Sequence, residues 1–367
     1  MHDILLAGDI ITINSMFGKD FNPNTITPDN GCYFGLSHDP ESAALVLLSA
    51  PWDTTTSLRS GSSYAPDAII EVSRYVDFYE PLAPNSWQKG IATAPIDYSI
   101  QDLSHRLRSD AERVISLHDE LGMSVIDNLM YDRRLRRVNE GSVEVNNNIF
   151  QQASNWLSKD KIVGLVGGDQ SVTYGIVRAM GYKYEKLGLL HIDSKCDMRE
   201  AFQGFDFSHA STMFNIMRDV PQVDKLVSVG VQEFSPIEWE RVSNNGRIKV
   251  FTAQQMWSDQ FEGTPWSKIV DDIIAELPDH VYISLDIDGL MNECSPNKGH
   301  MTAGGLNFHQ VIYLMDRIIT SGRRIVGFDL TEVSPNIENK ADMRIVARLL
   351  FKMCSIALKG VDTPAIM

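Results

Sequence analysis

The sequence has no hydrophobic run long enough to cross a membrane. Its apolar stretches, such as residues 43–49, fall far short of the roughly 20 residues that span a bilayer. Acidic side chains, Asp3 and Asp9, stand near the N-terminus where a signal peptide would carry positive charge. The four cysteines have no paired spacing typical of a zinc site or a disulfide framework. We therefore expect a cytoplasmic chain with reduced thiols and no membrane partner.

Basic residues are scarce relative to acidic ones. The chain has 33 Lys and Arg against 48 Asp and Glu, which gives a net charge of −15. Because this negative field repels phosphate backbones, we expect no nucleic-acid partner. The hydrophobic share of 43% and the charged share of 22% are ordinary for globular proteins and argue against disordered, collagen-like and coiled-coil classes.

Short β-branched runs alternate with longer helical patterns along the chain. This order predicts an α/β fold, with three α/β/α layers around a mostly parallel central sheet. The expected strands are 44–49, 162–166, 187–192, 225–230, 281–286 and 324–330. The expected helices are 171–180, 267–276, 308–320 and 342–358.

The organisation of the chain indicates one main domain. Residues 1–43 have no clear period and are interpreted as an N-terminal extension, and 44–367 as a single domain. An insertion is expected around 85–160, where an amphipathic stretch ends at Gly122 and a very polar stretch follows. That insertion is either a helix pair or a mobile excursion.

Polar side chains follow four of the predicted strands. The segments are GGDQS at 167–171, DSKCD at 193–197, SLDID at 284–288 and TEVSP at 331–335. Ligands of parallel sheets bind beyond the carboxyl ends of the strands, and clustered carboxylates suit Mn²⁺, Mg²⁺ or Ca²⁺. The alternative is that these acidic residues cap the helices that follow. The four aspartates are Asp193, Asp197, Asp286 and Asp288.

Together with PWDTTTSLRSGSSYAPDAI at 51–69 and SPNKGHMTAGGL at 295–306, these segments resemble the ureohydrolase superfamily of arginase, agmatinase and formimidoylglutamase. The resemblance extends from about residue 50 to the C-terminus. It implies an arginase-like fold, hydrolysis of linear amidines or guanidines at two Mn²⁺ ions, and a homo-oligomer, either a trimer or a hexamer.

Two metal-ligand positions depart from the family pattern. The family motif GGDHS has its histidine replaced by Gln170, and the motif DAHxD has its histidine replaced by Lys195. By resemblance, the remaining metal ligands are Gln170, Asp193, Asp197, Asp286 and Asp288.

Lys195 changes the expected metal content. A lysine ammonium has no lone pair, so among carboxylates that keep it protonated it replaces a metal ion instead of binding one. We expect it within salt-bridge distance of two or more of the aspartates. Four carboxylates and one ammonium leave three negative charges, which one divalent ion reduces to one. The sequence therefore predicts a degenerate site with one Mn²⁺ ion or none.

Three further residues match functional positions of the family. His209, in FSHAST, matches a proton shuttle, although a lone histidine at a helix start is often structural. Glu332, in DLTEVSP, matches the carboxylate that binds the substrate guanidinium, with a helix-capping acid as the alternative. Arg199 resembles the arginine of formimidoylglutamase that suits a substrate carboxylate, unless it is simply solvated. The expected ligand is a small cationic amidine or guanidino compound.

Two functions remain open from the sequence. The first is a hydrolase of linear amidine C–N bonds, in guanidino or formimino substrates, that works with at most one metal ion. The alternative is a non-catalytic, metal-poor protein of the arginase fold with a binding or assembly role. Lys195 is the residue on which this choice depends, because the family's nucleophile bridges two ions.

Overall fold

The computed structural model describes residues 21–57, 60–122, 129–294, 302–336 and 341–361. Its centre is an eight-stranded, all-parallel sheet with the strand order β2-β1-β3-β8-β7-β4-β5-β6. The strands are β1 (Leu45–Ala50), β2 (Ile91–Thr93), β3 (Ile162–Gly167), β4 (Leu187–Ile192), β5 (Val223–Val231), β6 (Ile248–Thr252), β7 (His280–Asp286) and β8 (Arg324–Thr331).

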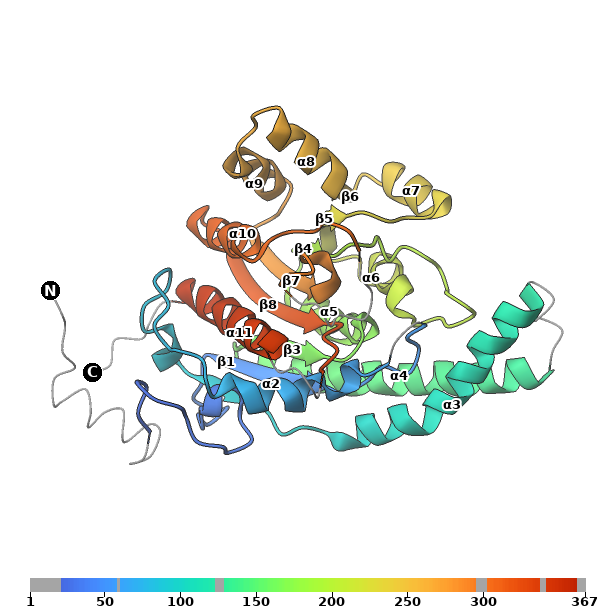
Figure 1. Cartoon of the computed structure of the whole chain (residues 1–367), viewed down its shortest axis with the longest axis horizontal. Coiled ribbons are helices and arrows are strands. Elements are labelled where there is room, and N and C mark those ends of the chain that lie inside the picture. Colours follow the sequence, from blue (N-terminus) through green and yellow to red (C-terminus); the bar gives the residue numbers. More distant parts are fainter. Residues whose placement is uncertain (1–20, 58–59, 123–128, 295–301, 337–340, 362–367) are drawn as a thin grey trace, which may run out of the picture.

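Helices cover both faces of this sheet (Figure 1). One apolar core lies between the sheet and α2, α9, α10 and α11, and a second lies between the sheet and α3, α4, α5 and α6. The helices are α2 (Ala65–Ser73), α3 (Tyr98–Leu121), α4 (Leu129–Leu157), α5 (Thr173–Lys183), α6 (Thr212–Asp219), α7 (Pro236–Ser243), α8 (Ala253–Phe261), α9 (Trp266–Ala275), α10 (Phe308–Thr320) and α11 (Ala341–Lys359).

The two cores follow from the alternation of side chains along each strand. In β1, Leu45 and Leu47 belong to the first core, whereas Val46 and Leu48 belong to the second. Parallel strands buried on both faces read as continuous apolar runs, and all six residues of β1 are buried. The predicted three-layer α/β/α architecture is therefore confirmed.

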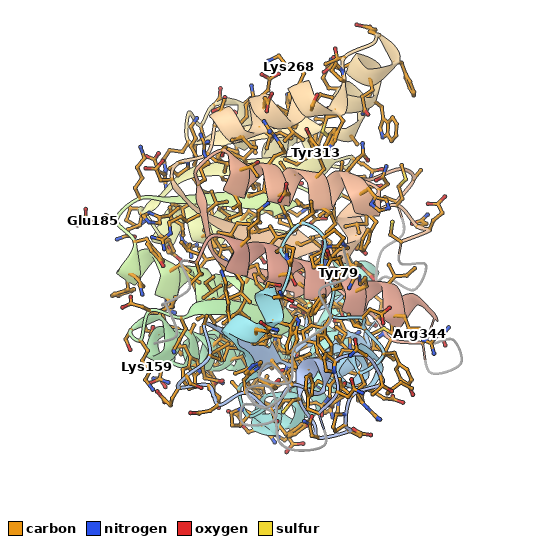
Figure 2. The ribbon with its side chains drawn as sticks, turned by 90° about the vertical axis from the view of Figure 1, so that its left-hand side faces the viewer. Tyr79, Lys159, Glu185, Lys268, Tyr313 and Arg344 are labelled. Carbon is orange, nitrogen blue, oxygen red and sulfur yellow. The ribbon has the colours of Figure 1, made fainter. Side chains whose placement is uncertain are left out.

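All six predicted strands are present, and two short ones went unpredicted. Both missed strands, β2 and β6, are the edge strands of the sheet. An edge strand buries fewer side chains, so its apolar pattern is weaker: in β6, only Ile248 is fully buried. Charged side chains such as Lys159, Glu185 and Lys268 lie at the periphery, away from the sheet (Figure 2).

The polar stretch before β3 forms the helix pair α3 and α4. Although α4 is polar overall, it buries Val138 and Val145 against the second core. Buried Asp110 of α3 pairs with Arg134 and Arg137 of α4, the latter at 2.6 Å, and so joins the two helices. Of the two interpretations of this region, the structure has the helix pair.

Residues before β1 pack into the first core as well. Phe21 lies against the aromatic rings of Phe78 and Trp87, and Phe34 packs edge-on against Phe351 of α11. The division into an extension at 1–43 and one domain at 44–367 stays a prediction. Among the described residues, no helix is long and apolar enough to span a membrane.

The sheet order brings the four polar segments together. Strands β3, β8, β7 and β4 are neighbours in that order, so their carboxyl ends meet along one stretch of the sheet edge. The backbone N–H of Glu332, after β8, donates to the carbonyl of Gly168, after β3, at 2.8 Å. Residues 295–301 of the SPNKGHMTAGGL segment lie outside the described residues.

Candidate functional site

A cavity of about 420 Å³ opens at the carboxyl ends of these four strands. Acidic residues dominate its wall, with seven carboxylates against two basic side chains. The acidic residues are Asp119, Asp193, Asp197, Glu233, Asp286, Asp288 and Glu332, and the basic residues are Lys195 and Arg199. Such a cavity favours a cationic ligand, because the nearby carboxylates lower the electrostatic energy of a positive charge.

Two of the aspartates cap the turns that follow their strands and still face the cavity. Asp286 Oδ1 accepts the backbone N–H of Asp288 at 2.7 Å, and Asp193 Oδ1 accepts that of Lys195 at 3.0 Å. The second oxygen of Asp193 points to the interior of the site, 3.2 Å from Nε2 of His191. Capping and ligand binding are therefore compatible roles here, since a carboxylate has two oxygens.

Three residues of the cavity have strained backbones: Gln203, with a φ of 53°, and two of the predicted site residues. Asp197 and Glu332 have φ values of 52° and 60°, in the left-handed region that non-glycine residues rarely occupy. Each such conformation costs on the order of 1 kcal/mol and persists only where the surrounding structure holds it. Strain of this kind clusters at functional sites, which supports the sequence-based choice of these two residues.

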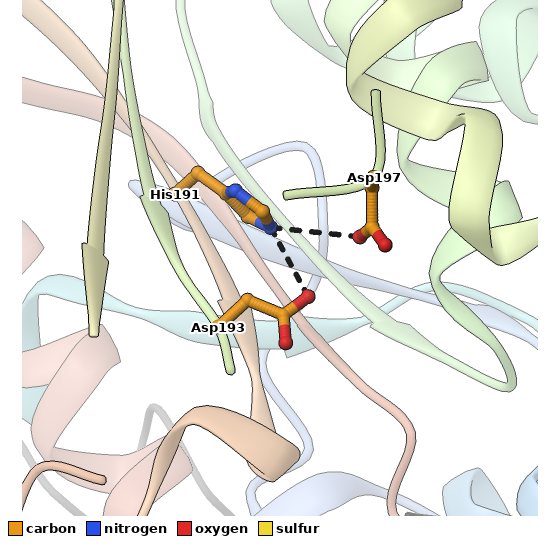
Figure 3. A group of neighbouring side chains, drawn as sticks. All are labelled: His191, Asp193 and Asp197. Carbon is orange, nitrogen blue, oxygen red and sulfur yellow. Dashed lines mark hydrogen bonds and ion pairs between the residues drawn. The ribbon is translucent and has the colours of Figure 1, made fainter. Parts of the chain in front are cut away.

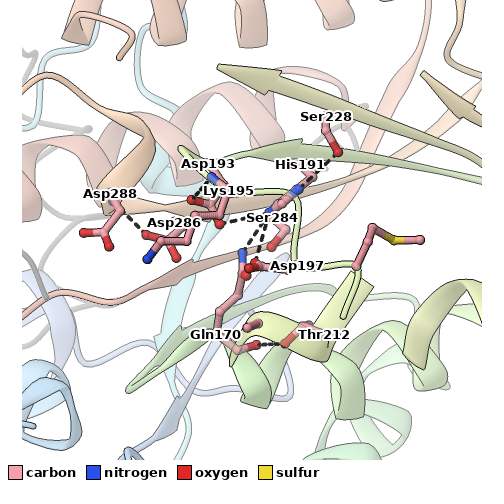
Figure 4. A network of polar contacts seen from close by, with 12 residues as sticks. Gln170, His191, Asp193, Lys195, Asp197, Thr212, Ser228, Ser284, Asp286 and Asp288 are labelled. Atoms are coloured by element: carbon pink, nitrogen blue, oxygen red, sulfur yellow. Dashed lines mark hydrogen bonds and ion pairs between the residues drawn. The ribbon is translucent and has the colours of Figure 1, made fainter. Parts of the chain in front are cut away.

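Lys195 stands among the four aspartates and stays protonated (Figure 4). Burial by itself would lower its pKa, but the charges of the aspartates raise the pKa above its ordinary value. In the part of the chain that the structure describes, no direct ion pair joins the ammonium to these aspartates, so the expected salt bridges are wrong. The long side chain reaches into the cavity while its backbone forms a β-bridge with Glu233, and it acts on the carboxylates across the cavity.

Burial and mutual repulsion raise the pKa of three of the cavity carboxylates. The pKa values of Asp197 and Asp286 lie well above the ordinary value, first because of burial and then because of the charge of Asp193. Burial, followed by the charge of Asp169, raises the pKa of Glu332 to about 8. Without a bound cation, the cluster therefore holds protons near neutral pH.

The three residues predicted to contact substrate all line the cavity. Glu332 Oε1 accepts the backbone N–H of Gln170 at 3.0 Å, so this carboxylate does support the short 3₁₀ turn after β3. His209 begins another 3₁₀ turn, with its ring 6.5 Å from that of Phe202. Arg199 stacks over Phe202 at 4.7 Å, and its Nε lies 3.5 Å from Glu238, which leaves the guanidinium half-exposed at the cavity.

The sequence-based choice of residues missed His191. This histidine is completely buried at the end of β4, and its Nε2 faces Asp193 Oδ2 at 3.2 Å and Asp197 Oδ2 at 3.7 Å (Figure 3). Its Nδ1 lies 3.2 Å from Ser228 Oγ on β5. The signal was the period of two in a strand, which places His191 on the same face as Asp193.

Asp119 is a second residue that the sequence did not indicate. It lies near the C-terminal end of α3, and together with Ile115 it forms part of the cavity wall. Nothing local distinguishes it from other exposed acids of an amphipathic helix. Only the packing of the helix pair beside the sheet brings it to the cavity.

The donor set decides which metal centre fits these residues. The two-ion centre implied by the family resemblance does not fit, because the protonated ammonium of Lys195 has no lone pair for an ion. A single ion fits: Gln170 is buried beside Asp193 and Asp197, and its Oε1 has no hydrogen-bond partner among the described residues.

Known proteins similar to this chain include ureohydrolases. The N(1)-aminopropylagmatine ureohydrolase of Thermus thermophilus is 28% identical over 335 residues, which cover 90% of this chain and 95% of the relative. An agmatinase of Bacillus cereus is 25% identical over 319 residues, with 87% and 93% covered.

Solved structures agree on the fold. The proclavaminate amidino hydrolase of Streptomyces clavuligerus superimposes with a TM-score of 0.67 at 19% identity, covering 93% of this chain and 100% of that one. The formimidoylglutamase of Bacillus subtilis gives a TM-score of 0.66 at 18% identity, with 94% of each chain covered. The model of the Arginase family matches residues 43–355, most of the sequence, and the chain therefore belongs to the Arginase family.

Proposed function

We propose that this chain hydrolyses a C–N bond of a linear amidine, in a guanidino or formimino substrate, with at most one Mn²⁺ ion. The observation that carries the proposal is the acidic cavity at the strand ends, with Glu332 and the aspartate cluster in its wall. Membership of the Arginase family and similarity to ureohydrolases support the same chemistry.

Glu332 binds the cationic end of the substrate in this proposal. A planar amidinium presents parallel N–H donors that match a carboxylate, and such charge-assisted bonds are about twice as strong as neutral ones. A bound cation also favours the charged form of Glu332, whose pKa burial otherwise raises to about 8. Arg199, half-exposed at the same cavity, would pair with a substrate that carries a carboxylate, such as a formimino amino acid.

The reaction adds water across the C–N bond. The water oxygen bonds to the amidine carbon, the C–N bond breaks, and the leaving nitrogen takes up a proton. His209 lines the cavity and supplies or accepts that proton, because an imidazole nitrogen can both donate and accept one. Lys195 holds a fixed positive charge beside the aspartates and limits their mutual repulsion. A bound divalent ion would supply Lewis-acid polarisation and a water of lowered pKa.

One observation favours the alternative, a non-catalytic protein that binds a cationic ligand. The same fixed charge of Lys195 removes the position of a second ion, on which the family's bridging nucleophile depends. In that case the acidic cavity binds an amidine without turnover. Both functions are proposed for a cytoplasmic homo-oligomer, and mass photometry of the purified chain tests the trimer or hexamer.

A turnover and binding screen separates the two functions. Arginine, agmatine, guanidinobutyrate and formimidoylglutamate are incubated with the purified chain and MnCl₂, and the release of urea, formamide and ammonia is measured. Calorimetry measures the binding of each compound in parallel. Hydrolysis of any of them supports the enzyme, whereas binding without turnover supports the alternative.

Glu332→Gln is the test variant, and the exposed Glu240→Gln is its matched control. We expect Glu332→Gln to weaken binding of the preferred compound at least tenfold and Glu240→Gln to leave it unchanged. Equal affinity in both variants would remove Glu332 from the ligand site. Preference for formimidoylglutamate, lost in Arg199→Met, would assign Arg199 to the substrate carboxylate.

A further inference from the structure

His191 lies within β4 and presents its imidazole to the aspartate cluster from the strand itself, whereas the aspartates lie at or after strand ends. Three polar side chains approach its Nε2: Asp193 Oδ2 at 3.2 Å, Asp197 Oδ2 at 3.7 Å and the Gln170 amide nitrogen at 3.1 Å. All four residues are almost completely buried. The group is therefore a buried polar cluster at the end of β4, and Gln170, Asp193 and Asp197 also line the cavity.

These separations match the edges of a metal coordination polyhedron. Ligand atoms at about 2.1 Å from an ion lie about 3.0 Å apart in an octahedron and about 3.4 Å apart in a tetrahedron. The separation of 3.2 Å between His191 Nε2 and Asp193 Oδ2 lies in this range, and that of 3.7 Å to Asp197 Oδ2 exceeds it by a few tenths of an ångström. The ligand atoms of His191, Asp193 and Asp197 all lie within 4.8 Å of one another. One ion therefore fits between them with small side-chain movements.

With the Gln170 amide as the structure orients it, the polar atoms around His191 Nε2 are not all satisfied. If Nε2 of His191 carries a proton, it can donate to Asp193, but it then opposes the N–H of the Gln170 amide. If Nε2 is bare, it accepts from Gln170, but its lone pair then faces a carboxylate oxygen at 3.2 Å. In both cases Gln170 Oε1, completely buried, has no partner among the described residues.

A cation resolves this conflict. Turning the Gln170 amide by half a revolution about its last bond exchanges its nitrogen and oxygen and brings the unsatisfied Oε1 toward Nε2 of His191. All four groups then present lone pairs to a common centre. Ser228 Oγ, 3.2 Å from His191 Nδ1, accepts the remaining ring proton and so keeps Nε2 bare (Figure 4).

We propose that this chain binds a single divalent transition-metal ion through His191 Nε2, Asp193, Asp197 and Gln170 Oε1. This site replaces the family's two-ion centre and lies on the side of the cluster toward β4. Its mixed imidazole and oxygen donors suit Mn²⁺, Fe²⁺, Co²⁺ or Zn²⁺ better than Mg²⁺ or Ca²⁺. The inference builds on the single-ion clause of the proposed function but does not require turnover.

Pulsed electron paramagnetic resonance of the full chain with one equivalent of MnCl₂ tests the site. In wild-type protein we expect one bound ion with a nitrogen modulation that changes when histidine is labelled with ¹⁵N. His191→Asn should abolish the modulation and raise the Kd for Mn²⁺ at least tenfold. His209→Ala is the matched control, because it removes the other imidazole of the cavity, and it should keep the modulation.

Two milder variants keep the proposal testable if His191→Asn fails to fold, which circular dichroism would reveal. Ser228→Ala frees the ring orientation and should raise the Kd about tenfold while nitrogen modulation remains. Gln170→Ala removes one oxygen ligand and should also raise the Kd. Unchanged affinity in both variants overturns the proposal.

Four other results would also overturn the proposed metal site. In the wild-type chain these are two bound ions, no bound ion, or one ion whose spectrum shows no histidine nitrogen. The fourth is a nitrogen modulation that remains in folded His191→Asn. Failure of the proposed hydrolase function has a different signature, since it is read from the release of urea, formamide and ammonia. A chain that binds one ion through His191 and hydrolyses none of the four compounds supports the site and contradicts the enzyme.

Discussion

Replacing Lys195 should admit a second metal ion. The aspartate cluster and Lys195 sum to −4 + 1 = −3 when fully ionised, so one divalent ion leaves −1 and a second would leave +1. With a neutral residue at position 195 the same ions leave −2 and then 0. Protons held by the aspartates at neutral pH are displaced as each ion binds.

The magnitude follows from the charge of the ammonium. Two unit charges about 4 Å apart interact by about 4 kcal/mol at an effective dielectric constant of about 20, and a divalent ion doubles this value. At about 8 Å the interaction falls by half. Removing the charge of Lys195 should therefore strengthen binding of the second ion by roughly 4 to 8 kcal/mol, or about three to six powers of ten in Kd.

Four variants separate the charge from the ligand that the substitution adds. Lys195→Met removes only the charge, Lys195→His also adds an imidazole, and Gln170→His only exchanges one neutral ligand for another. Lys186→His, at the opposite end of β4, is the matched control. Metal content after dialysis and calorimetry with MnCl₂ measure stoichiometry and Kd for each.

We expect wild type and Lys186→His to bind at most one ion, and Lys195→His to bind two. The gain should decrease from Lys195→His to Lys195→Met to Gln170→His. A larger gain from Gln170→His than from Lys195→His would refute the electrostatic reasoning. If the double variant Gln170→His with Lys195→His binds no more metal than wild type, the assignment of both positions to the metal shell is wrong.

Three further predictions concern stability and specificity. In the metal-free protein, the free energy of unfolding should fall as the pH rises from 4.5 to about 8, because the folded protein keeps the Glu332 proton that the unfolded chain releases. Glu332→Gln should remove roughly 5 kcal/mol of this fall in urea titrations, and parallel curves for the two proteins would contradict it. Asp119→Asn should weaken binding of agmatine, whose amine end is positive, by about fivefold or less. Binding of guanidinobutyrate, which has no such amine, should not change. Equal effects on both compounds in calorimetry would show that Asp119 does not contribute to recognition. A methyl group on Gly168 would lie 1.9 Å from the carbonyl oxygen of Trp52, so Gly168→Ala should lower the free energy of unfolding in urea by roughly 3 kcal/mol. Gly246 has open space around it, and Gly246→Ala should lower the same free energy by less than about 0.5 kcal/mol. Similar losses in the two variants would refute the steric argument.

The sequence alone determined the sheet and the edge at which the chemistry lies. A parallel strand buried on both faces is a continuous apolar run, so the strand at residues 187–192 was visible without any knowledge of its neighbours. The polar residues directly after such runs, Asp193 and Glu332 among them, had to lie at the carboxyl edge, because all strands of a parallel sheet end there.

Tertiary structure alone decided how these residues meet. Within its apolar run, only the strand period related His191 to Asp193, and its contact with Gln170 exists because β3 and β4 are brought into one sheet with β8 and β7 between them. The distance from the Lys195 ammonium to the aspartates could not be predicted from the sequence either, because the flexible four-carbon side chain can place the charge at many points in the cavity. Asp119 reaches the cavity only through helix packing. Local sequence patterns determine which side chains lie at the carboxyl ends of the strands. Which of these side chains come into contact depends on strand order and on packing between residues far apart in the chain.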